Sequence, residues 1–339
     1  MSDYFRSLLE SLAEPFVALA RPEQRIFWPF LFTSAALAAV VLWFARRKGT
    51  SASPRGIVRA LFARQIWQHP SALLDYRLLP VKALLRAALF APFVVSTFAI
   101  AAAVASGLRG ALGDAGALDL SPAEIAVVFT LTAFLADDWS RYALHRLMHR
   151  VPALWELHKL HHSAEVLTPF TLYRTHPVES FLNGLRGALV IGAVTGAFVW
   201  LFGPRVRGWE ILGVDALGFL WTLAGANLRH SHVWLRFGRL EQWLLSPAQH
   251  QIHHSKDPRH YNKNYGELFA LWDWMFGTLY IPSRAPEKLD FGLTGEDAQI
   301  HPTLLAAYFV PFTNCGRILR GHARHLLAAR QRPKPGLPG

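Results

Sequence analysis

The chain has 339 residues, of which 52% are hydrophobic and 17% are charged, and its formal net charge is +12. That apolar content is high for a soluble enzyme. The basic residues flank apolar segments without a recognisable nucleic-acid motif, which argues against nucleic acid as a partner. Cys315 is the only cysteine, so an intrachain disulfide, a thiolate zinc site and a Cys-ligated iron–sulfur cluster are excluded. Any bound metal must therefore be held by nitrogen and oxygen.

The N-terminal part predicts membrane attachment followed by two transmembrane helices. Residues 1–27 mix acidic, basic and apolar residues with helical periodicity, which favours an amphipathic helix on the membrane surface over a cleavable signal peptide. A bilayer core needs about 20 mostly apolar helical residues, and residues 28–45 and 84–106 are the first two candidates. Residues 46–82 carry eight Lys/Arg and residues 107–121 carry one, which places 46–82 in the cytoplasm.

A third membrane helix is expected to begin at Ser121-Pro122-Ala123-Glu124, which reads as a capping box with proline at the first helical position. Its apolar part starts at residues 125–136, and no helix breaker follows before Pro152. Residues 125–149 make roughly 36 Å of helix at 1.5 Å per residue, slightly more than a hydrocarbon core. The end of this helix therefore emerges on the cytoplasmic side, and a new helix is predicted over residues 153–164.

Residues 185–202 and 209–226 form a second apolar pair. Both segments could span the membrane, or together they could form a shallow re-entrant hairpin, which Asp215 inside the second segment slightly favours. Gly192-x3-Gly196 is typical of close helix packing. Either scheme returns the chain to the cytoplasmic face, where a second capping box, Ser246-Pro247-Ala248-Gln249, predicts another helix start.

The fold expected from these features is all-α: a multipass helical membrane protein with a cytoplasmic helical cap that holds a histidine-ligated dimetal site. Residues 1–120 would form the N-terminal helix and the first two spans, residues 121–284 a catalytic domain, and residues 285–339 a cytoplasmic C-terminal segment. From Gly316 onward the chain has six Lys/Arg and no acid, which suits a basic helix against anionic lipid. The Ala/Arg/Leu-rich usage suggests a bacterial inner membrane.

Three histidine clusters carry the chemistry, and together they hold eight of the 16 histidines. Residues three or four apart lie on one face of a helix, so each cluster points its imidazoles in one direction, and neutral imidazole is the commonest protein ligand for transition metals. With His230 as a plausible ninth ligand, the set is too large for one ion and suits two. An all-nitrogen shell with open positions favours iron that binds O2. The clusters are His145-x3-His149, His158-x2-His161-His162 and His250-x2-His253-His254.

These clusters lie within longer motifs between about residues 138 and 280, and this region resembles the fatty acid hydroxylase/sterol desaturase superfamily of integral-membrane di-iron enzymes. The first 120 and last 55 residues show no comparable match. The motifs are Asp138-Trp139-x2-Tyr142-x2-His145-Arg146-x2-His149, Leu154-Trp155-x2-His158-x2-His161-His162-Ser163, Arg174-x-His176-Pro177-x-Glu179, His230-Ser231, Ser246-Pro247-x2-His250-x2-His253-His254-Ser255, Asn264-Tyr265-Gly266 and Trp272-Asp273-x2-Phe276-Gly277-Thr278.

The resemblance implies an O2-dependent hydroxylase or desaturase that uses two iron ions to attack an unactivated C–H bond of a lipid, and it favours hydroxylation modestly. The lipid could be sterol-like, a fatty acyl chain, an ether lipid or a carotenoid. The implied metal ligands are His145, His149, His158, His161, His162, His230, His250, His253 and His254, with His176 either a tenth ligand or a residue that positions one. His232 is expected beside the metals or facing substrate. The remaining histidines, His69, His260, His301, His322 and His325, are expected at the surface.

Ligating histidines usually donate their second N–H to a carboxylate or carbonyl. The candidate carboxylates at the catalytic site are Asp138, Glu156, Glu179 and Asp273, and the alternative for each is an ordinary salt bridge with a neighbouring arginine.

Other classes of function fit the motifs less well. A metal transporter places its site near the bilayer midplane, a bis-His haem protein leaves the His-His doublets unexplained, and a zinc-dependent lipid hydrolase lacks the His-Glu-x-x-His type of general base. The chain shows no nucleotide fingerprint and no haem domain, so an oxygenase of this kind would need a separate electron-transfer partner at its basic cytoplasmic face.

Overall fold

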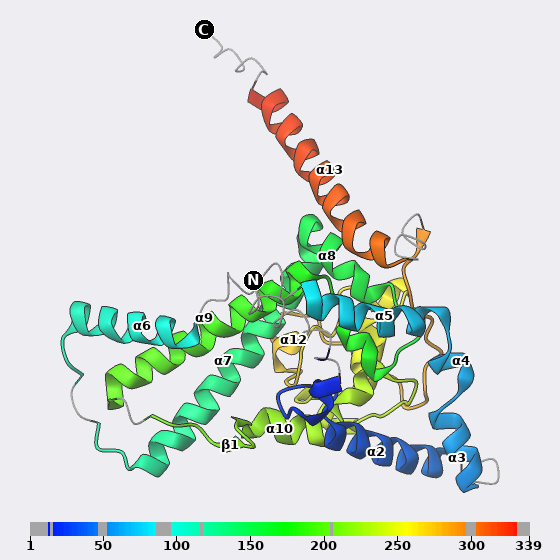
Figure 1. Ribbon diagram of the computed structural model, residues 1–339, viewed down its shortest axis with the longest axis horizontal. Coiled ribbons are helices and arrows are strands. Elements are labelled where there is room, and N and C mark those ends of the chain that lie inside the picture. Colours follow the sequence, from blue (N-terminus) through cyan, green and yellow to red (C-terminus); the bar gives the residue numbers. More distant parts are fainter. Residues whose placement is uncertain are drawn as a thin grey trace.

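The computed structural model describes residues 13, 16–46, 53–85, 96–115, 118–203, 206–295 and 303–330. They form a mostly helical body, an arm of three helices that extends from it, and a C-terminal helix that projects away (Figure 1). The elements are η1 (Ala18–Ala20), α2 (Trp28–Arg46), α3 (Pro54–Leu61), α4 (Arg64–Trp67), α5 (Pro70–Leu85), α6 (Thr97–Leu112), α7 (Pro122–Arg150), α8 (Pro152–His162), η4 (Pro169–Tyr173), α9 (Pro177–Phe202), β1 (Glu210–Ile211), β2 (Val214–Asp215), α10 (Ala216–Leu223), η5 (Ala226–His230), η6 (Gly238–Gln242), α11 (Pro247–His253), η7 (Pro258–His260), α12 (Leu271–Met275) and α13 (Leu304–Arg330).

Helices α6, α7 and α9 lie side by side and form the arm (Figure 1). The two glycines predicted to allow close packing face α6. A Cβ on Gly196 would lie 2.5 Å from the carbonyl oxygen of Ala101, and one on Gly192 would lie 2.7 Å from Cβ of Ile100. Because real Cβ atoms do not approach other atoms so closely, only glycine lets α9 pack against α6 at this distance. The prediction from the Gly-x3-Gly spacing is confirmed.

Two proline-led helix starts position the body against the arm. The Ser121 capping box with Glu124 begins α7 as predicted. Val151 is in an extended conformation between α7 and α8, and Pro152 occupies the first turn of α8. Proline cannot continue the preceding helix but fits at the start of the next one. The chain therefore turns directly after the last residue of α7 and sends α8 into the body.

Two of the expected spans are not continuous helices. Within residues 84–106, positions 86–95 lie outside the described residues, and α6 has its own N-cap at Ser96, whose hydroxyl accepts from the N–H of Ala99. Residues 209–226 contain a short antiparallel hairpin, with Glu210 opposite Asp215, followed by the eight-residue helix α10. The turn passes through Leu212 and Gly213 at positive φ. Local capping overrides hydropathy in both places.

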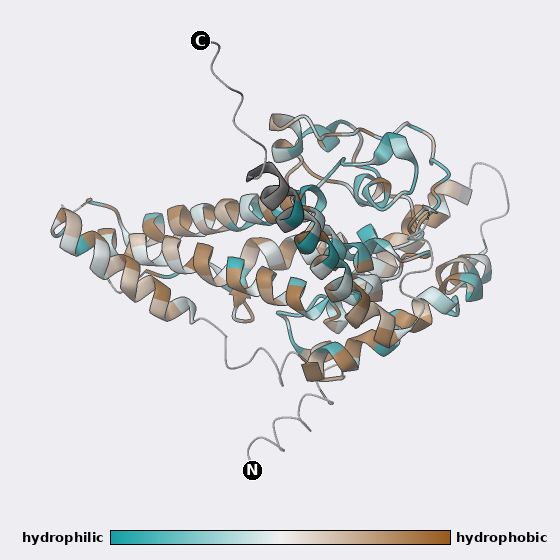
Figure 2. Ribbon diagram, turned by 90° about the horizontal axis from the view of Figure 1, so that it is seen from above, coloured by the Kyte–Doolittle hydropathy of each residue, from teal (hydrophilic) through white to brown (hydrophobic). Residues whose placement is uncertain are grey.

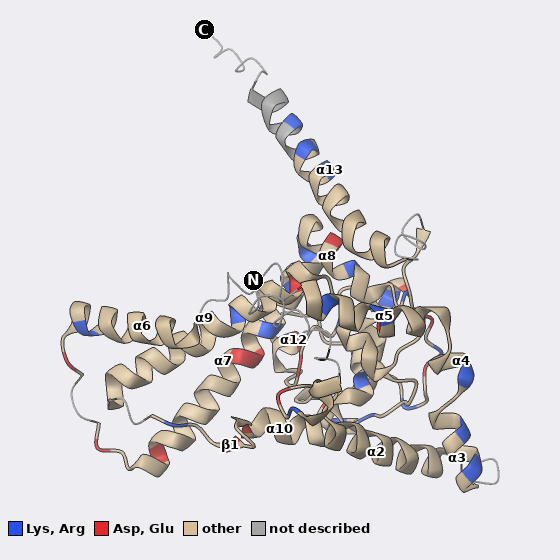
Figure 3. Ribbon diagram, viewed as in Figure 1, with Lys and Arg blue, Asp and Glu red and all other residues tan. Residues whose placement is uncertain are grey.

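Two described helices, α2 and α9, are long and apolar enough to cross a membrane. Only 17% of either apolar window is buried, whereas the core helix of a soluble protein is mostly buried. Hydrophobic residues run along the arm in Figure 2, and charged residues lie towards its ends in Figure 3. Residues 1–12, 14 and 15 of the expected surface helix lie outside the described residues. From Ala18 onward the segment does not continue as an α-helix, because it is a 3-10 helix at Ala18–Ala20 followed by turns.

Helix α13 is held to the body at its N-terminal end. Ala307 and Tyr308 pack with Leu74 and Leu78 of α5 and with Leu160 of α8 in one buried cluster. α8 is therefore packed against α13 through this cluster and against α7 as well.

Candidate metal centre

Nine histidines from four elements converge in two adjoining buried groups. Helices α7, α8 and α11 and the 3-10 helix η5 contribute them, and within each group the ligand nitrogens lie within 4.8 Å of one another. The first group is His145, His149, His158, His162 and His253, and the second is His161, His230, His250 and His254. The structure thus brings together nine of the ten histidines named as candidate ligands.

The second group has the spacing of a coordination shell. Nε2 of His230 lies 3.1 Å from Nε2 of both His250 and His254 and 3.3 Å from Nε2 of His161, and the nitrogens of His250 and His254 are 3.2 Å apart. Nitrogens at adjacent corners around a metal ion held about 2.0–2.1 Å away lie about 2.8–3.4 Å apart. A neutral imidazole has one N–H, so mutual hydrogen bonds cannot satisfy four converging lone pairs. The donor set fits a bound cation.

A different observation indicates that the first group could hold a metal. Nε2 of each of its five histidines is buried and has no hydrogen-bond partner among the described residues, although buried polar atoms are normally paired. Three of these rings use Nδ1 instead. His145 donates to the carbonyl of Tyr265 at 2.8 Å, His253 donates to the carbonyl of Lys263 at 2.7 Å, and His158 is 2.9 Å from a carboxylate oxygen of Glu179. These contacts fix the tautomer that leaves Nε2 free for a metal.

The two carbonyls come from one tight loop. Asn262 and Asn264 flank Lys263 at φ values of 60° and 57°, a left-handed conformation that asparagine tolerates better than most residues. The side chain of Asn264 donates to the carbonyl of Gln249 in α11 and accepts from the N–H of Tyr280. The Asn-Tyr-Gly motif therefore turns backbone carbonyls towards the histidines.

Asp273 supports this loop from behind. Its carboxylate accepts from the N–H of Tyr265 at 2.9 Å, the N–H of Gly266 at 2.8 Å and the hydroxyl of Thr278 at 2.6 Å. Burial raises the pKa of Asp273, and these hydrogen bonds oppose the shift. Asp273 acts on His145 through the backbone of Tyr265.

The other three candidate carboxylates have different surroundings. Glu179 contacts His158 directly. Asp138 accepts from the N–H groups of Leu268 and Phe269 and from the indole of Trp272, so it ties α7 to the segment after the loop. Glu156 pairs with Lys159 and accepts from Asn314 of α13. Glu156 therefore forms an ordinary salt bridge, with Lys159 rather than with the arginine expected from the sequence.

Burial favours the neutral form of all nine imidazoles. Burial lowers the pKa of His145, His158 and His161 to about 3. For the other six, burial and the neighbouring histidines lower the pKa well below its ordinary value. Neutral imidazole is the form that binds a metal, so the site is prepared for a cation without deprotonation.

His176 is not in either group. Its Nδ1 accepts from the N–H of Val178 at the start of α9, and its Nε2 lies 3.1 Å from the carbonyl of Tyr308. Both ring nitrogens are thus engaged with backbone, and His176 joins α9 to α13. His232 is exposed and its Nε2 is 2.8 Å from the carbonyl of Ala60.

The expectation of a surface position is wrong for His260. This residue is 2% exposed, its ring lies against Tyr280, and its Nε2 is 3.5 Å from Glu287. His69 is half-buried, with Nδ1 accepting from the N–H of Ser71. His301 and the side chains of His322 and His325 lie outside the described residues.

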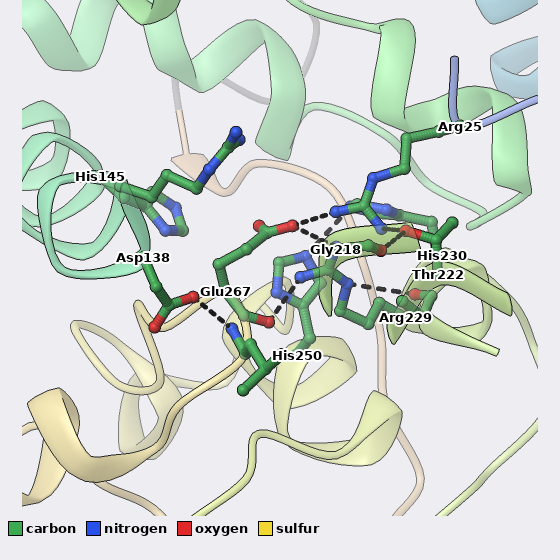
Figure 4. A network of polar contacts seen from close by, with 12 residues as sticks. Arg25, Asp138, His145, Gly218, Thr222, Arg229, His230, His250 and Glu267 are labelled. Carbon is green, nitrogen blue, oxygen red and sulfur yellow. Dashed lines mark hydrogen bonds and ion pairs between the residues drawn. The ribbon is translucent and has the colours of Figure 1, made fainter. Parts of the chain in front are cut away.

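The sequence motifs did not reveal an ion network beside the second group. Glu267 accepts from Arg25 and, at 2.7 Å, from Arg229, the residue before His230. Figure 4 shows Glu267 between the two arginines, close to His230 and His250. Burial opposes ionisation of Glu267, but Arg229 and Arg25 hold its pKa well below the ordinary value. The only sequence signal was its position directly after Asn264-Tyr265-Gly266.

A cavity of about 1680 Å³ lies between the arm and the body. Its apolar wall includes Phe129, Phe134 and Phe181, and its wall on the side of the body includes Glu267 and Leu268. The cavity adjoins the segment from Tyr265 to Leu268, and the Tyr265 carbonyl of this segment accepts from His145. The volume is large enough for a lipid-sized molecule.

Comparison with known proteins agrees with this site. The chain is 31% identical over 183 residues to the ornithine lipid hydroxylase of Rhizobium tropici, covering 53% of this chain and 49% of that protein. It is 30% identical to the alkylglycerol monooxygenase of Danio rerio over 48% of this chain and 32% of the relative. It is 28% identical to the lathosterol oxidase of Mus musculus over 47% of this chain and 48% of the relative.

The chain therefore spans about a third to a half of the length of these relatives, all of which are oxidoreductases by name. No solved structure gives a significant match. The model of the fatty acid hydroxylase family matches residues 130–278, the segment that carries every histidine of the two groups. The family match and the relatives thus agree with the fatty acid hydroxylase/sterol desaturase superfamily that the motifs of this region resemble.

Proposed function

We propose that the protein is an O2-dependent di-iron hydroxylase or desaturase acting on an unactivated C–H bond of a membrane lipid. The observation that carries this proposal is the convergence of nine buried, neutral imidazoles in two adjoining groups. The names of the relatives, which include lipid hydroxylases and monooxygenases, support the same reaction class.

Each group would hold one iron ion, and the pair would supply the redox chemistry that activates O2 towards a C–H bond. The protein's own residues prepare the site. Glu179 and the carbonyls of Lys263 and Tyr265 orient three of the rings, and burial keeps the imidazoles unprotonated. The cavity between arm and body would receive the lipid beside the segment from Tyr265 to Leu268.

The proposal places α2 and the arm in the bilayer, with the metal centre on the cytoplasmic face, in a bacterial inner membrane. The apolar and mostly unburied surfaces of α2 and α9 support insertion. A hydroxylation consumes two electrons and two protons besides O2, so the protein would depend on a separate electron-transfer partner.

Metal content tests the function. Protein purified in detergent under anaerobic conditions should contain two irons per chain by mass spectrometry, and His149→Ala and His253→Ala should each lower that number. His232→Ala is the matched control, because His232 is exposed and outside both groups. One zinc per chain would favour lipid hydrolysis instead, two zincs would require reconstitution with iron before activity is measured, and a haem or no metal would contradict the proposal.

A further inference from the structure

The wall of the cavity contains a largely buried arginine whose hydrogen-bond donors are only partly satisfied. The side chain of Arg186 in α9 is 10% exposed. Its Nη1 donates to Asp137 at 2.7 Å and to the hydroxyl of Ser140 at 2.5 Å. Its Nε is buried and has no hydrogen-bond partner among the described residues. A guanidinium donates hydrogen bonds and accepts none, so this position calls for an acceptor from a ligand.

Beside Arg186, two guanidiniums share one carboxylate. Arg186 and Arg141 share the single carboxylate of Asp137, one on each oxygen. Glu267, which also lines the cavity, is paired with Arg25 in the lining and with Arg229 behind it. Asp138 is already bonded to three N–H groups. The group of Arg186, Arg141 and Asp137 therefore carries one positive charge in excess, while Arg207 and three exposed carboxylates, Glu23, Glu210 and Asp215, lie at the rim in contact with water.

Apolar side chains complete the cavity. Phe129, Phe134, Phe181, Leu185 and Ile191 line it beside the charged residues. A ligand that fits both parts has an apolar chain and a compact group of hydrogen-bond acceptors with negative charge. Charge-assisted hydrogen bonds from arginine to an oxyanion are stronger than those to a neutral oxygen.

We propose that the cavity binds an amphiphile with an oxyanion head group, a carboxylate or phosphate, and that Arg186 and Arg141 bind this group. This inference rests on the proposed function in that the amphiphile is the substrate of the same enzyme. It narrows the substrate class from membrane lipids in general to anionic ones. The head group would lie against α7 and α9, with the chain among the phenylalanines.

Equilibrium binding of two probes with the same 12-carbon chain tests the proposal. Dodecyl phosphate and dodecanol are titrated into full-length protein in nanodiscs of zwitterionic phosphatidylcholine. The wild type should bind the phosphate at least tenfold more tightly. Arg186→Gln and Arg141→Gln should each lower this preference about tenfold, the value of one charge-assisted hydrogen bond.

A variant with the opposite effect separates recognition from structural support. Asp137→Asn releases both arginines from their carboxylate and should strengthen phosphate binding several-fold. If Arg186→Gln does not fold, Arg141→Gln and Asp137→Asn still decide the matter. Arg259→Gln is the control, because Arg259 is an exposed arginine paired with Asp257 and does not line the cavity; it should bind both probes as the wild type does.

Equal binding of the two probes by the wild type, or an unchanged preference in both arginine variants, would overturn the proposal. Inorganic phosphate that binds as tightly as dodecyl phosphate would show a small-anion site and would overturn it too. Iron content is measured on the same preparations. Two irons per chain with no preference for dodecyl phosphate over dodecanol would contradict only the head-group proposal. A preference for dodecyl phosphate in protein that contains no iron would contradict only the proposed reaction.

Discussion

Replacement of Glu179 by glutamine examines how the metal centre is held. Oε1 of Glu179 lies 2.9 Å from Nδ1 of His158, and the side chains are 4% and 5% exposed, respectively. Glutamine keeps the size of the side chain and an oxygen that can accept from Nδ1, but it removes the negative charge. His158 would keep its tautomer and lose part of the stabilisation of its metal-bound form.

The magnitude follows from that one contact. A hydrogen bond to a charged group contributes about 1.5–3 kcal/mol and a neutral one about 0.5–1.5 kcal/mol, so the change costs about 1–1.5 kcal/mol. That corresponds to roughly a tenfold weaker affinity for one ion, at the lower end of the 10–100-fold typical for residues that orient metal ligands. Competition with a chelator of known affinity, followed by mass spectrometry, measures this change.

Glu156→Gln is the matched control. Glu156 is also a buried glutamate near the histidines in sequence, but its carboxylate contacts Lys159 and Asn314 and no histidine. This variant should bind metal as tightly as the wild type. Wild-type affinity in Glu179→Gln, or an equal loss of affinity in Glu156→Gln, would refute this role of Glu179.

Three further outcomes are expected. His161→Ala and His162→Ala should each remove one metal per chain from a different group, and loss of both ions in either variant by mass spectrometry would show that the groups do not bind independently. His260→Ala should lower the free energy of unfolding by about 1–3 kcal/mol because the ring is buried; chemical denaturation that shows no change would restore the surface assignment. The metal-free protein should lose stability as the pH falls from about 6.5, the ordinary histidine pKa, towards about 3, the pKa of His145, because the unfolded chain binds more protons in that range; a melting temperature that is the same at pH 7.5 and pH 5 would contradict this.

Helix starts were predictable from the sequence because their signals are local. The capping boxes at Ser121 and Ser246 are both present, and each depends on residues only three positions apart. Hydropathy was less reliable, since residues 84–106 and 209–226 are apolar but contain the N-caps Ser96 and Asp215. A capping side chain begins a new helix whatever the hydropathy of the window around it.

Contacts between distant segments could not be predicted in this way. The pairing of Glu267 with Arg25 joins residues 242 positions apart, and no motif marks Arg25. The burial of His260 depends on Tyr280 and Glu287, which meet it only when the chain folds. Proximity in sequence likewise suggested Glu156 as a partner of the histidines, although its carboxylate is bonded to Asn314 of α13.

Helix geometry accounts for the division of the histidines into two groups. Residues four apart point the same way, and the pairs His145/His149, His158/His162 and His250/His254 each stay within one group. The expectation that every cluster points all its imidazoles in one direction is wrong for two of the three, because His158 and His161, like His250 and His253, belong to different groups. Adjacent residues on a helix point about 100° apart because there are 3.6 residues per turn. A His-His doublet therefore cannot direct both rings to one ion from one helix face. His161-His162 and His253-His254 instead give one ring to each group, so each doublet spans two neighbouring sites. This division of the doublets supports the proposal of two adjacent ions over a single metal or a haem.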